Sequence, residues 1–171
     1  MTVDVDERKA AATRALTLLA GLCGDFRSIR FAEEDLAPAA PLRTTLGELK
    51  DAGLVKLAVQ PGSSPHPYLL TLNGWYVAQN VSGRFDSEEF DQRRGRLCAA
   101  MKKATAGRNE RAIVDWRHLA AEAKVPADWL LNVFEAQVLH RLDPKGRYHV
   151  RFEPPNVRIE PTFGQEPVEF G

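Results

Sequence analysis

The same order of short elements recurs in the two halves of this chain, and that repetition constrains the fold more than any single motif. Each half is patterned as helix, short strand, helix, turn, helix, strand, turn and strand, with the middle helix of the first half only faint. No residue-level repeat accompanies the pattern. A length of 171 residues allows one large domain or two small ones, and the repeated order favours two.

Apolar periodicity and chain breakers predict the elements of the first half. An apolar face at i, i+3 and i+4 predicts a helix over residues 6–22. A leucine stripe at i, i+4 and i+7 predicts a second helix over residues 42–53, which ends at Gly53. Alternating patterns at residues 54–60 and 68–72 predict two strands, joined by a turn that is rich in proline.

A polar stretch at residues 80–87 is the predicted linker to the second half. A long helix follows it and stops at a break over residues 107–109. Periodicity then predicts a short strand, two further helices and a two-stranded hairpin. The expected elements are the long helix at 87–105, the strand at 112–116, the helices at 119–123 and 127–142, and the hairpin strands near 148–152 and 157–159.

Two stretches resemble winged helix-turn-helix proteins. The segments LRTTLGELKDAGLVKL and YLLTLNGWYVA resemble the recognition helix, wing and closing helix of bacterial winged-helix regulators, and HLAAEAKVPADWLLNVFEA is similar to a helix-turn-helix. The resemblance implies an α+β fold, mainly α, with two tandem winged-helix modules, each of three helices plus a β-hairpin wing. The modules are expected at residues 1–82 and 83–162, followed by an irregular tail at 163–171.

The distribution of charge is the main indication of function. The 23 Lys and Arg residues balance the 23 Asp and Glu residues, so the net charge gives no support for binding to nucleic acid. Residues 93–117, however, hold eight basic groups against two acidic ones, a local charge of +6. Either this stretch binds a polyanion, or it is a solvated helix face balanced by nearby acids.

We expect the helix at residues 42–53 to contact DNA, because an Arg–Thr–Thr face suits phosphates and base edges. A plain solvated face is the alternative, since Glu48 and Asp51 lie on the same helix. The basic stretch and the second hairpin would add phosphate contacts. The predicted DNA-binding residues are Arg43, Thr44, Thr45, Lys50, Arg93, Arg96, Lys103, Arg108, Arg111, Arg151 and Arg158.

The helix at residues 127–142 is apolar almost all round, which is typical of a buried or interfacial helix. Its few polar positions would present an acidic face that repels phosphate. We therefore expect Trp129, Phe134 and Val138 to meet another surface, which is the first module, the long helix or a second copy. Because regulators that read palindromic sites are two-fold symmetric, a homodimer is expected.

Features of an enzyme or of a metal site are lacking in the sequence. It contains none of the common phosphate-loop, nucleophile-elbow or zinc-protease motifs, its four histidines are scattered, and neither cysteine falls in a C-x-x-C pair. We therefore expect no catalysis, no cofactor and no metal. Cys23 and Cys98 are interpreted as small core residues. Without a visible signal peptide or membrane span, the chain is expected to be cytoplasmic and to have no membrane partner.

These features predict a DNA-binding protein that acts as a transcription regulator on double-stranded DNA. The alternative is a non-catalytic scaffold subunit that docks protein partners through its winged helices, in a layout similar to the accessory subunits of chromosome-organising ATPase complexes. The near-neutral charge and the apolar helix favour the alternative, and the basic stretch favours DNA.

Overall fold

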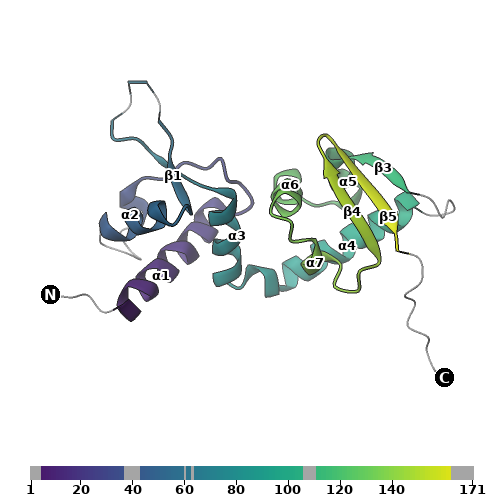
Figure 1. Ribbon diagram of the computed structural model, residues 1–171, viewed down its shortest axis with the longest axis horizontal. Helices are drawn as coiled ribbons and strands as arrows, with labels where there is room; N and C mark the ends of the chain where they lie inside the picture. Colours follow the sequence, from purple (N-terminus) through teal and green to yellow (C-terminus); the bar gives the residue numbers. More distant parts are fainter. Residues whose placement is uncertain (1–4, 37–42, 60, 63, 106–110, 163–171) are drawn as a thin grey trace. The chain divides into compact units, whose positions relative to one another are not determined.

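The computed structural model describes residues 5–36, 43–59, 61, 62, 64–105 and 111–162, and for Arg43 and Thr44 it describes the backbone alone. The chain is α+β and mainly helical, with two small antiparallel sheets (Figure 1). It divides into two compact units, unit 1 at Met1–Asp86 and unit 2 at Ser87–Gly171. The predicted tail at 163–171 lies outside the described residues.

In its described residues, unit 1 contains three α-helices and a two-stranded hairpin. Its helices are α1 (Val5–Cys23), α2 (Arg43–Asp51) and α3 (Leu72–Val81), with a short 3-10 turn at Glu33–Leu36. The hairpin pairs β1 (Val55–Leu57) with β2 (Tyr68–Leu70), and an isolated bridge joins Phe31 to Tyr68 on the other side of β2. The short strand that the repeated order predicts between the first two helices of this half is therefore reduced to this single bridge.

The core of unit 1 forms where α1 and α3 pack against each other. Trp75 on α3 is fully buried, and its indole Nε1–H donates to the Gly24 carbonyl at 3.1 Å. The amide of the buried Gln79 donates to the same oxygen, also at 3.1 Å. These two bonds satisfy a carbonyl just past the end of α1, and they pair the indole N–H of Trp75 and the side-chain amide of Gln79 within the core.

The predicted linker at residues 80–87 is in fact largely structured. Helix α3 extends to Val81, and a 3-10 turn follows at Arg84–Asp86. Phe85 lies at the centre of this turn and is only 5% exposed, because its ring packs on Trp75 and Tyr76. One aromatic residue therefore ties the polar stretch to unit 1, and the division of the chain falls after Asp86 instead of at the expected 82.

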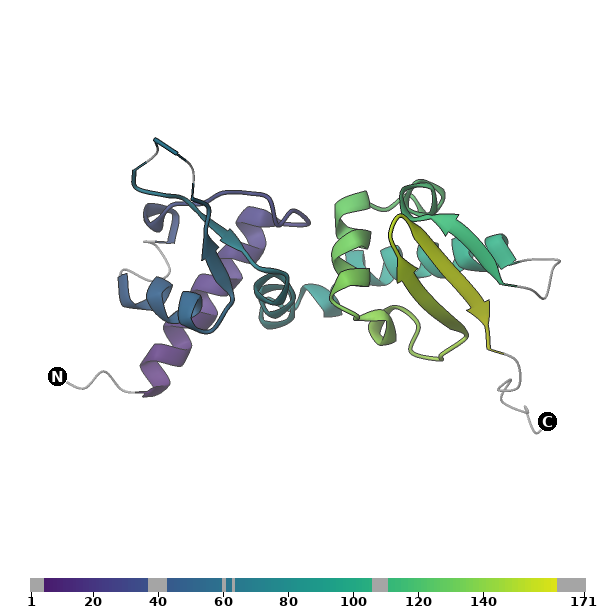
Figure 2. The same cartoon turned by 45° about the horizontal axis from the view of Figure 1, so that its top comes forward.

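Unit 2 packs helices against a three-stranded sheet with the order β3-β5-β4 (Figures 1 and 2). Alternation along the strands directs Val157 and Ile159 inward, where both are fully buried. The order of the elements follows the chain. They are α4 (Glu88–Thr105), β3 (Ala112–Asp115), α5 (Trp116–Ala123), α6 (Ala127–Glu135), α7 (Leu139–Leu142), β4 (Tyr148–Glu153) and β5 (Asn156–Pro161).

The sequence predicted a single helix over residues 127–142. This prediction is wrong, because the segment divides into α6 and α7. Gln137 adopts a left-handed φ of 56°. The Val138 N–H donates back to the Val133 carbonyl and the Gln137 N–H to the Phe134 carbonyl. This pair of bonds is a Schellman motif, and the burial of Val138 after the left-handed residue stabilises it. Helix α5 ends in the same way at Lys124, with a φ of 53°.

None of the helices in the described residues combines the length and the apolar character that are needed to cross a bilayer.

Candidate nucleic-acid interface

Helix α2 was expected to present Thr45 to solvent, and that expectation is wrong. Thr45 is 4% exposed and lies on the buried side with Leu46 and Leu49. The spacing explains this result, because Thr45 and Leu49 are four residues apart and share a face of the helix. Lys50 is exposed as predicted, and Arg43 lies in the first turn of α2, where only its backbone is described.

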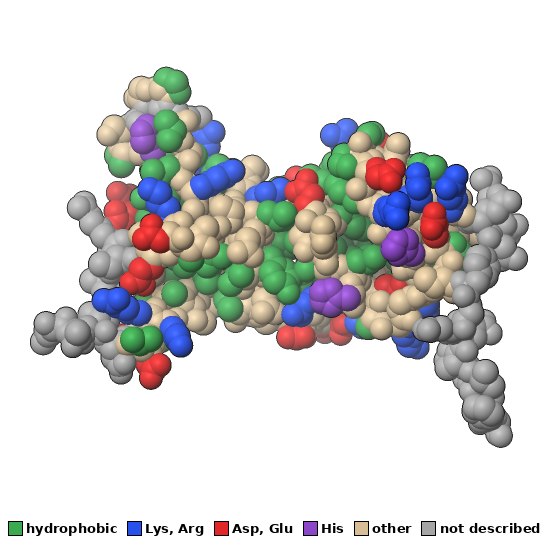
Figure 3. All heavy atoms as spheres, viewed as in Figure 1, with side chains coloured by type: hydrophobic (Ala, Val, Ile, Leu, Met, Phe, Trp, Pro, Cys, Tyr) green, Lys and Arg blue, Asp and Glu red, His purple; other side chains and the backbone are tan. Residues whose placement is uncertain are grey.

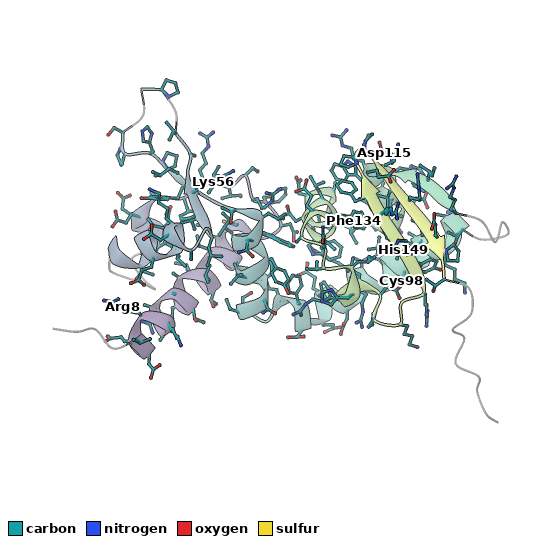
Figure 4. All side chains as sticks on the ribbon, in the orientation of Figure 1. Arg8, Lys56, Cys98, Asp115, Phe134 and His149 are labelled. Atoms are coloured by element: carbon teal, nitrogen blue, oxygen red, sulfur yellow. The ribbon has the colours of Figure 1, made fainter. Side chains whose placement is uncertain are left out.

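The described surface of α2 is nearly neutral. Lys50 is followed directly by the exposed Asp51. Glu48 forms an ion pair with Arg8 of α1 at 3.8 Å, an exposed contact that contributes little to stability. On the neighbouring hairpin, Lys56 is exposed on β1 (labelled in Figure 4). Sequence reasoning missed Lys56, although the alternation of β1 placed it on the face opposite Val55.

Arg93 of α4 is not available as a free phosphate ligand. Its guanidinium donates to Glu89 at 2.7 Å, lies 5.2 Å from the centre of the Trp129 ring, and leaves the side chain 13% exposed. The position predicts this burial, because Arg93 falls between Phe90 and Leu97 on the stripe that packs inward. The long stem of Arg93 covers apolar surface, while its charge is matched within the same helix.

Arg96 and Lys103 both contact α5. Arg96 donates through Nε to the Ala123 carbonyl at 3.2 Å and through a terminal nitrogen to the Lys124 carbonyl at 3.3 Å. It therefore caps the C-terminal end of α5. Lys103 pairs with Glu122 at 3.1 Å, and this contact holds the pKa of the Glu122 carboxyl below its ordinary value. The basic stripe expected on α4 is thus largely used within unit 2.

The remaining predicted cations differ in their surroundings. Arg108 lies outside the described residues. Arg111 is exposed, one residue before β3. Arg158 on β5 pairs with Glu153 of β4 at 3.5 Å, whereas Arg151 is exposed directly opposite it. In the space-filling view, several basic side chains gather over the hairpin of β4 and β5, with acidic side chains among them (Figure 3).

A row of basic side chains follows the outward face of β4 and the turn before it. The β4 row consists of Lys145, Arg147, His149 and Arg151, at every second position, and all four are exposed. His149 marks the middle of the row in Figure 4. Among the described residues, none of the three cations of the row has an ion pair. The hairpin therefore offers more accessible positive charge than α4, which the sum over residues 93–117 did not indicate.

Trp129, Phe134 and Val138 are all buried, and Trp129 and Phe134 each form a ring contact within unit 2. Trp129 packs edge-on against Phe90 of α4, and Phe134 stacks on Phe152 of β4 with ring centres 5.5 Å apart. These contacts place Trp129 and Phe134 in the core of unit 2. The surface that Trp129 meets is the long helix α4, one of the three surfaces expected for it, whereas Phe134 meets β4 of the same unit. The exposed side of α6 carries Asp128 and Glu135, as the sequence predicted, whereas Asn132, the third polar position of that face, is buried.

The cysteines and the acidic groups show no arrangement for metal chemistry. Within the described ranges, no group of three or more His, Cys, Asp or Glu side chains is placed to hold a metal ion. Burial raises the pKa of Cys23 to about 11, and burial together with the nearby Asp143 raises the pKa of Cys98. Both thiols are free, with Cys23 buried and Cys98 half-buried.

Comparison with known proteins adds no relative: no family model, curated protein or solved structure matches this chain.

Proposed function

We propose that this chain is a non-enzymatic DNA-binding protein of the tandem winged-helix type, which acts as a transcription regulator. In this proposal the helix-turn-helix of unit 1 is α2 with its flanking elements, and that of unit 2 is α5, the turn at Lys124 and α6. Each is followed by an antiparallel hairpin, β1–β2 or β4–β5, in the position of a wing. The coarse α+β fold is compatible with this architecture.

The observation that carries the proposal is the β4 row. Three of its four side chains are lysine or arginine. Arg147, His149 and Arg151 alternate along the extended segment, whereas Lys145 lies in the turn before it, next to Gly146 with a left-handed φ of 60°. Arg147 and Arg151 are four residues apart, which corresponds to about 13 Å along a strand. Such spacing allows separate phosphates of one backbone to be contacted at once. Arg151 was among the predicted DNA-binding residues.

The outward face of α6 is acidic, which does not suit a recognition helix that enters a DNA groove. Asp128 and Glu135 would lie against phosphate if α6 entered a groove, and this arrangement is unfavourable. Unit 2 is therefore proposed to contact the DNA backbone through its hairpin. Reading of bases is assigned to α2 of unit 1, where Arg43→Ala is expected to relax sequence preference while leaving non-specific affinity nearly unchanged.

The test is a salt titration of binding to duplex DNA. Replacement of Lys145, Arg147 and Arg151 by Gln should weaken binding to all sequences, and should lower the slope of log K against log salt by about 3. The matched control replaces Arg8, Lys9 and Lys102 by Gln, which changes the net charge equally on exposed helix positions. If the control weakens binding as much as the triple variant, the row has no special role. No binding to mixed genomic fragments at low salt would refute the proposal.

A second candidate function is that of a scaffold subunit that binds proteins. It is favoured by the neutralisation of α4, where Arg93 and Lys103 are paired with acids, and by the acidic side of α6. A scaffold would bind no duplex at low salt and would keep this behaviour in the triple Gln variant. The same titration therefore distinguishes the two functions.

A further inference from the structure

Strand β3 lies at the edge of the three-stranded sheet of unit 2 (Figures 1 and 2), and among the described residues it pairs with β5 alone. The central strand β5 pairs with it in the register Ala112 to Ile159 and Val114 to Val157. The Trp116 N–H donates to the Pro155 carbonyl at 3.0 Å, so the even-numbered residues direct their backbone groups toward β5. In an antiparallel ladder the directions alternate. The N–H and C=O of Ile113 therefore face the open edge.

The side chains along this edge are arranged for a protein contact. Ile113 is 57% exposed, and on the same outward face it is flanked by the exposed Arg111 and Asp115. On the inner face of the sheet, Ala112 and Val114 remain partly exposed, whereas Ile159 of the central strand is fully buried. A neighbouring strand would cover Ile113 and complete the burial of both inner residues.

The sequence of this edge is complementary to itself. When a second copy of residues 111–115 is laid antiparallel and centred on Ile113, each Arg111 falls opposite Asp115 of the second copy, and the two Ile113 side chains meet. The carboxylate of Asp115 accepts the Arg117 N–H through Oδ1 at 2.8 Å, so its other oxygen can accept from a guanidinium. Because the N–H and the C=O of Ile113 both face the open edge, the two copies of Ile113 would exchange backbone hydrogen bonds with each other.

We propose that two copies of this chain associate through β3, paired antiparallel about Ile113, to form a continuous six-stranded sheet. The contact is isologous, so that it closes at a dimer and leaves β4 at both outer edges. At the other edge, an antiparallel β4 pair centred on Val150 sets His149 opposite Arg151. The positions that flank the centre of the pair therefore lack an acidic group there.

This inference replaces α6 as the expected contact of a homodimer, and it does not depend on DNA binding. The strand is only four residues long, so the dimer is expected to be weak and to exchange with monomer at micromolar concentrations. Sedimentation equilibrium over a concentration series measures it directly. A single monomer mass at every concentration up to several hundred micromolar would overturn the proposal, as would an open-ended rise in mass, which indicates pairing of β3 with β4 of the next copy.

Charge exchange provides the sharpest experiment. Arg111→Glu sets Glu against Asp, and Asp115→Arg sets Arg against Arg, so each variant alone should be monomeric. In an equimolar mixture both pairs become complementary, and the heterodimer should form. Circular dichroism verifies that Asp115→Arg, which removes the N-terminal cap of α5, remains folded. Dimerisation of either variant alone, or monomers only in the mixture, would contradict the proposed pairing.

The Ile113 position gives a second test that leaves the cap intact. Ile113→Lys should weaken dimerisation about tenfold or more, whereas Val59→Lys, at an apolar residue of unit 1 that is 71% exposed, should leave it unchanged. Ile113→Cys should form an intermolecular disulfide under mild oxidation, because directly opposed residues of an antiparallel pair lie within disulfide range. Val59→Cys is the control. Equal crosslinking of the two variants would exclude a specific β3 contact.

Discussion

Gly74→Ala tests the close packing of the α3 backbone on the backbone at Leu54. Among the described glycines, Gly74 is the one at which an added Cβ would meet another atom within 4 Å. Gly74 lies in the first turn of α3, and a Cβ at this position would stand 1.7 Å from the Leu54 carbonyl oxygen and 2.7 Å from its carbon. To reach even 3.0 Å, which real Cβ atoms essentially require, α3 must move away from the chain between α2 and β1. Neighbouring atoms are backbone, so no side chain can rotate to relieve the overlap.

The magnitude follows from what this movement would break. The Leu54 carbonyl accepts the Thr71 N–H at 3.1 Å, and the Thr71 hydroxyl donates to the Gly53 carbonyl at 2.6 Å. Overpacking costs about 1–3 kcal/mol, and loss of one of these bonds adds about 1 kcal/mol. The better helix propensity of alanine returns roughly 0.5–1 kcal/mol. We expect a net loss of about 2–3 kcal/mol in the free energy of unfolding of unit 1.

The assay is urea and thermal unfolding followed by circular dichroism, with calorimetry to separate the two units. A loss of this size lowers the melting temperature of a domain of this length by about 10 °C or more. Gly47→Ala in α2 is the matched control, because a Cβ there meets nothing within 4 Å, and this variant should gain roughly 0.5–1 kcal/mol. If Gly74→Ala proved as stable as the wild type, the close packing of α3 on Leu54 would be refuted.

Three further predictions concern unit 2 and the titrating groups. Trp129→Ala should cost about 3–5 kcal/mol, measured by urea unfolding, because the ring is 3% exposed; a variant as stable as wild type would place Trp129 outside the core. Since the pKa of Cys23 is raised from 9.0 to about 11, its neutral thiol stabilises the fold below pH 9, and that contribution should be lost as the pH rises toward 11. Iodoacetamide at pH 8 should alkylate Cys98 before Cys23, and the reverse order would contradict the burial of Cys23. Lys103 lowers the pKa of Glu122 from 4.5. The difference in stability between the wild type and Glu122→Gln should therefore be present at neutral pH and vanish as the pH falls below 4.5. A difference that does not depend on pH would show that the Lys103–Glu122 pair does not form.

Local patterns were sufficient for most elements. The leucine stripe and Gly53 predicted α2 and its end, and the structure ends α2 at Asp51 with Gly53 in a left-handed φ of 73°. The alternation at residues 148–152 predicted β4 on one hairpin with β5. Such features depend on residues within one turn or one strand, so that a linear sequence contains the information needed to place them.

The candidate site was harder to predict from the sequence, because whether a charged side chain is paired or free depends on partners that are distant in the chain. Lys103 meets Glu122, nineteen residues away, and Arg96 reaches a carbonyl at Ala123, twenty-seven residues away. Neither contact has a local signal. The burial of Thr45 and Arg93, in contrast, could have been predicted from the sequence. Thr45 is four residues from Leu49 and Arg93 is three residues from Phe90, so both lie within the broad apolar face of their helix.

The sequence by itself therefore determined most of the elements, their order and the acidic residues Asp128 and Glu135 on the exposed side of α6, all of which follow from short-range periodicity. Tertiary structure alone decided which cations remain accessible, because pairing across α4 and α5 neutralises one set while the outward face of β4 leaves Arg147 and Arg151 without an acidic partner among the described residues. It also placed β3 at an open edge. The order of strands in a sheet depends on contacts between segments that are far apart in the chain. The local sequence pattern of a strand does not indicate which distant segment it will pair with.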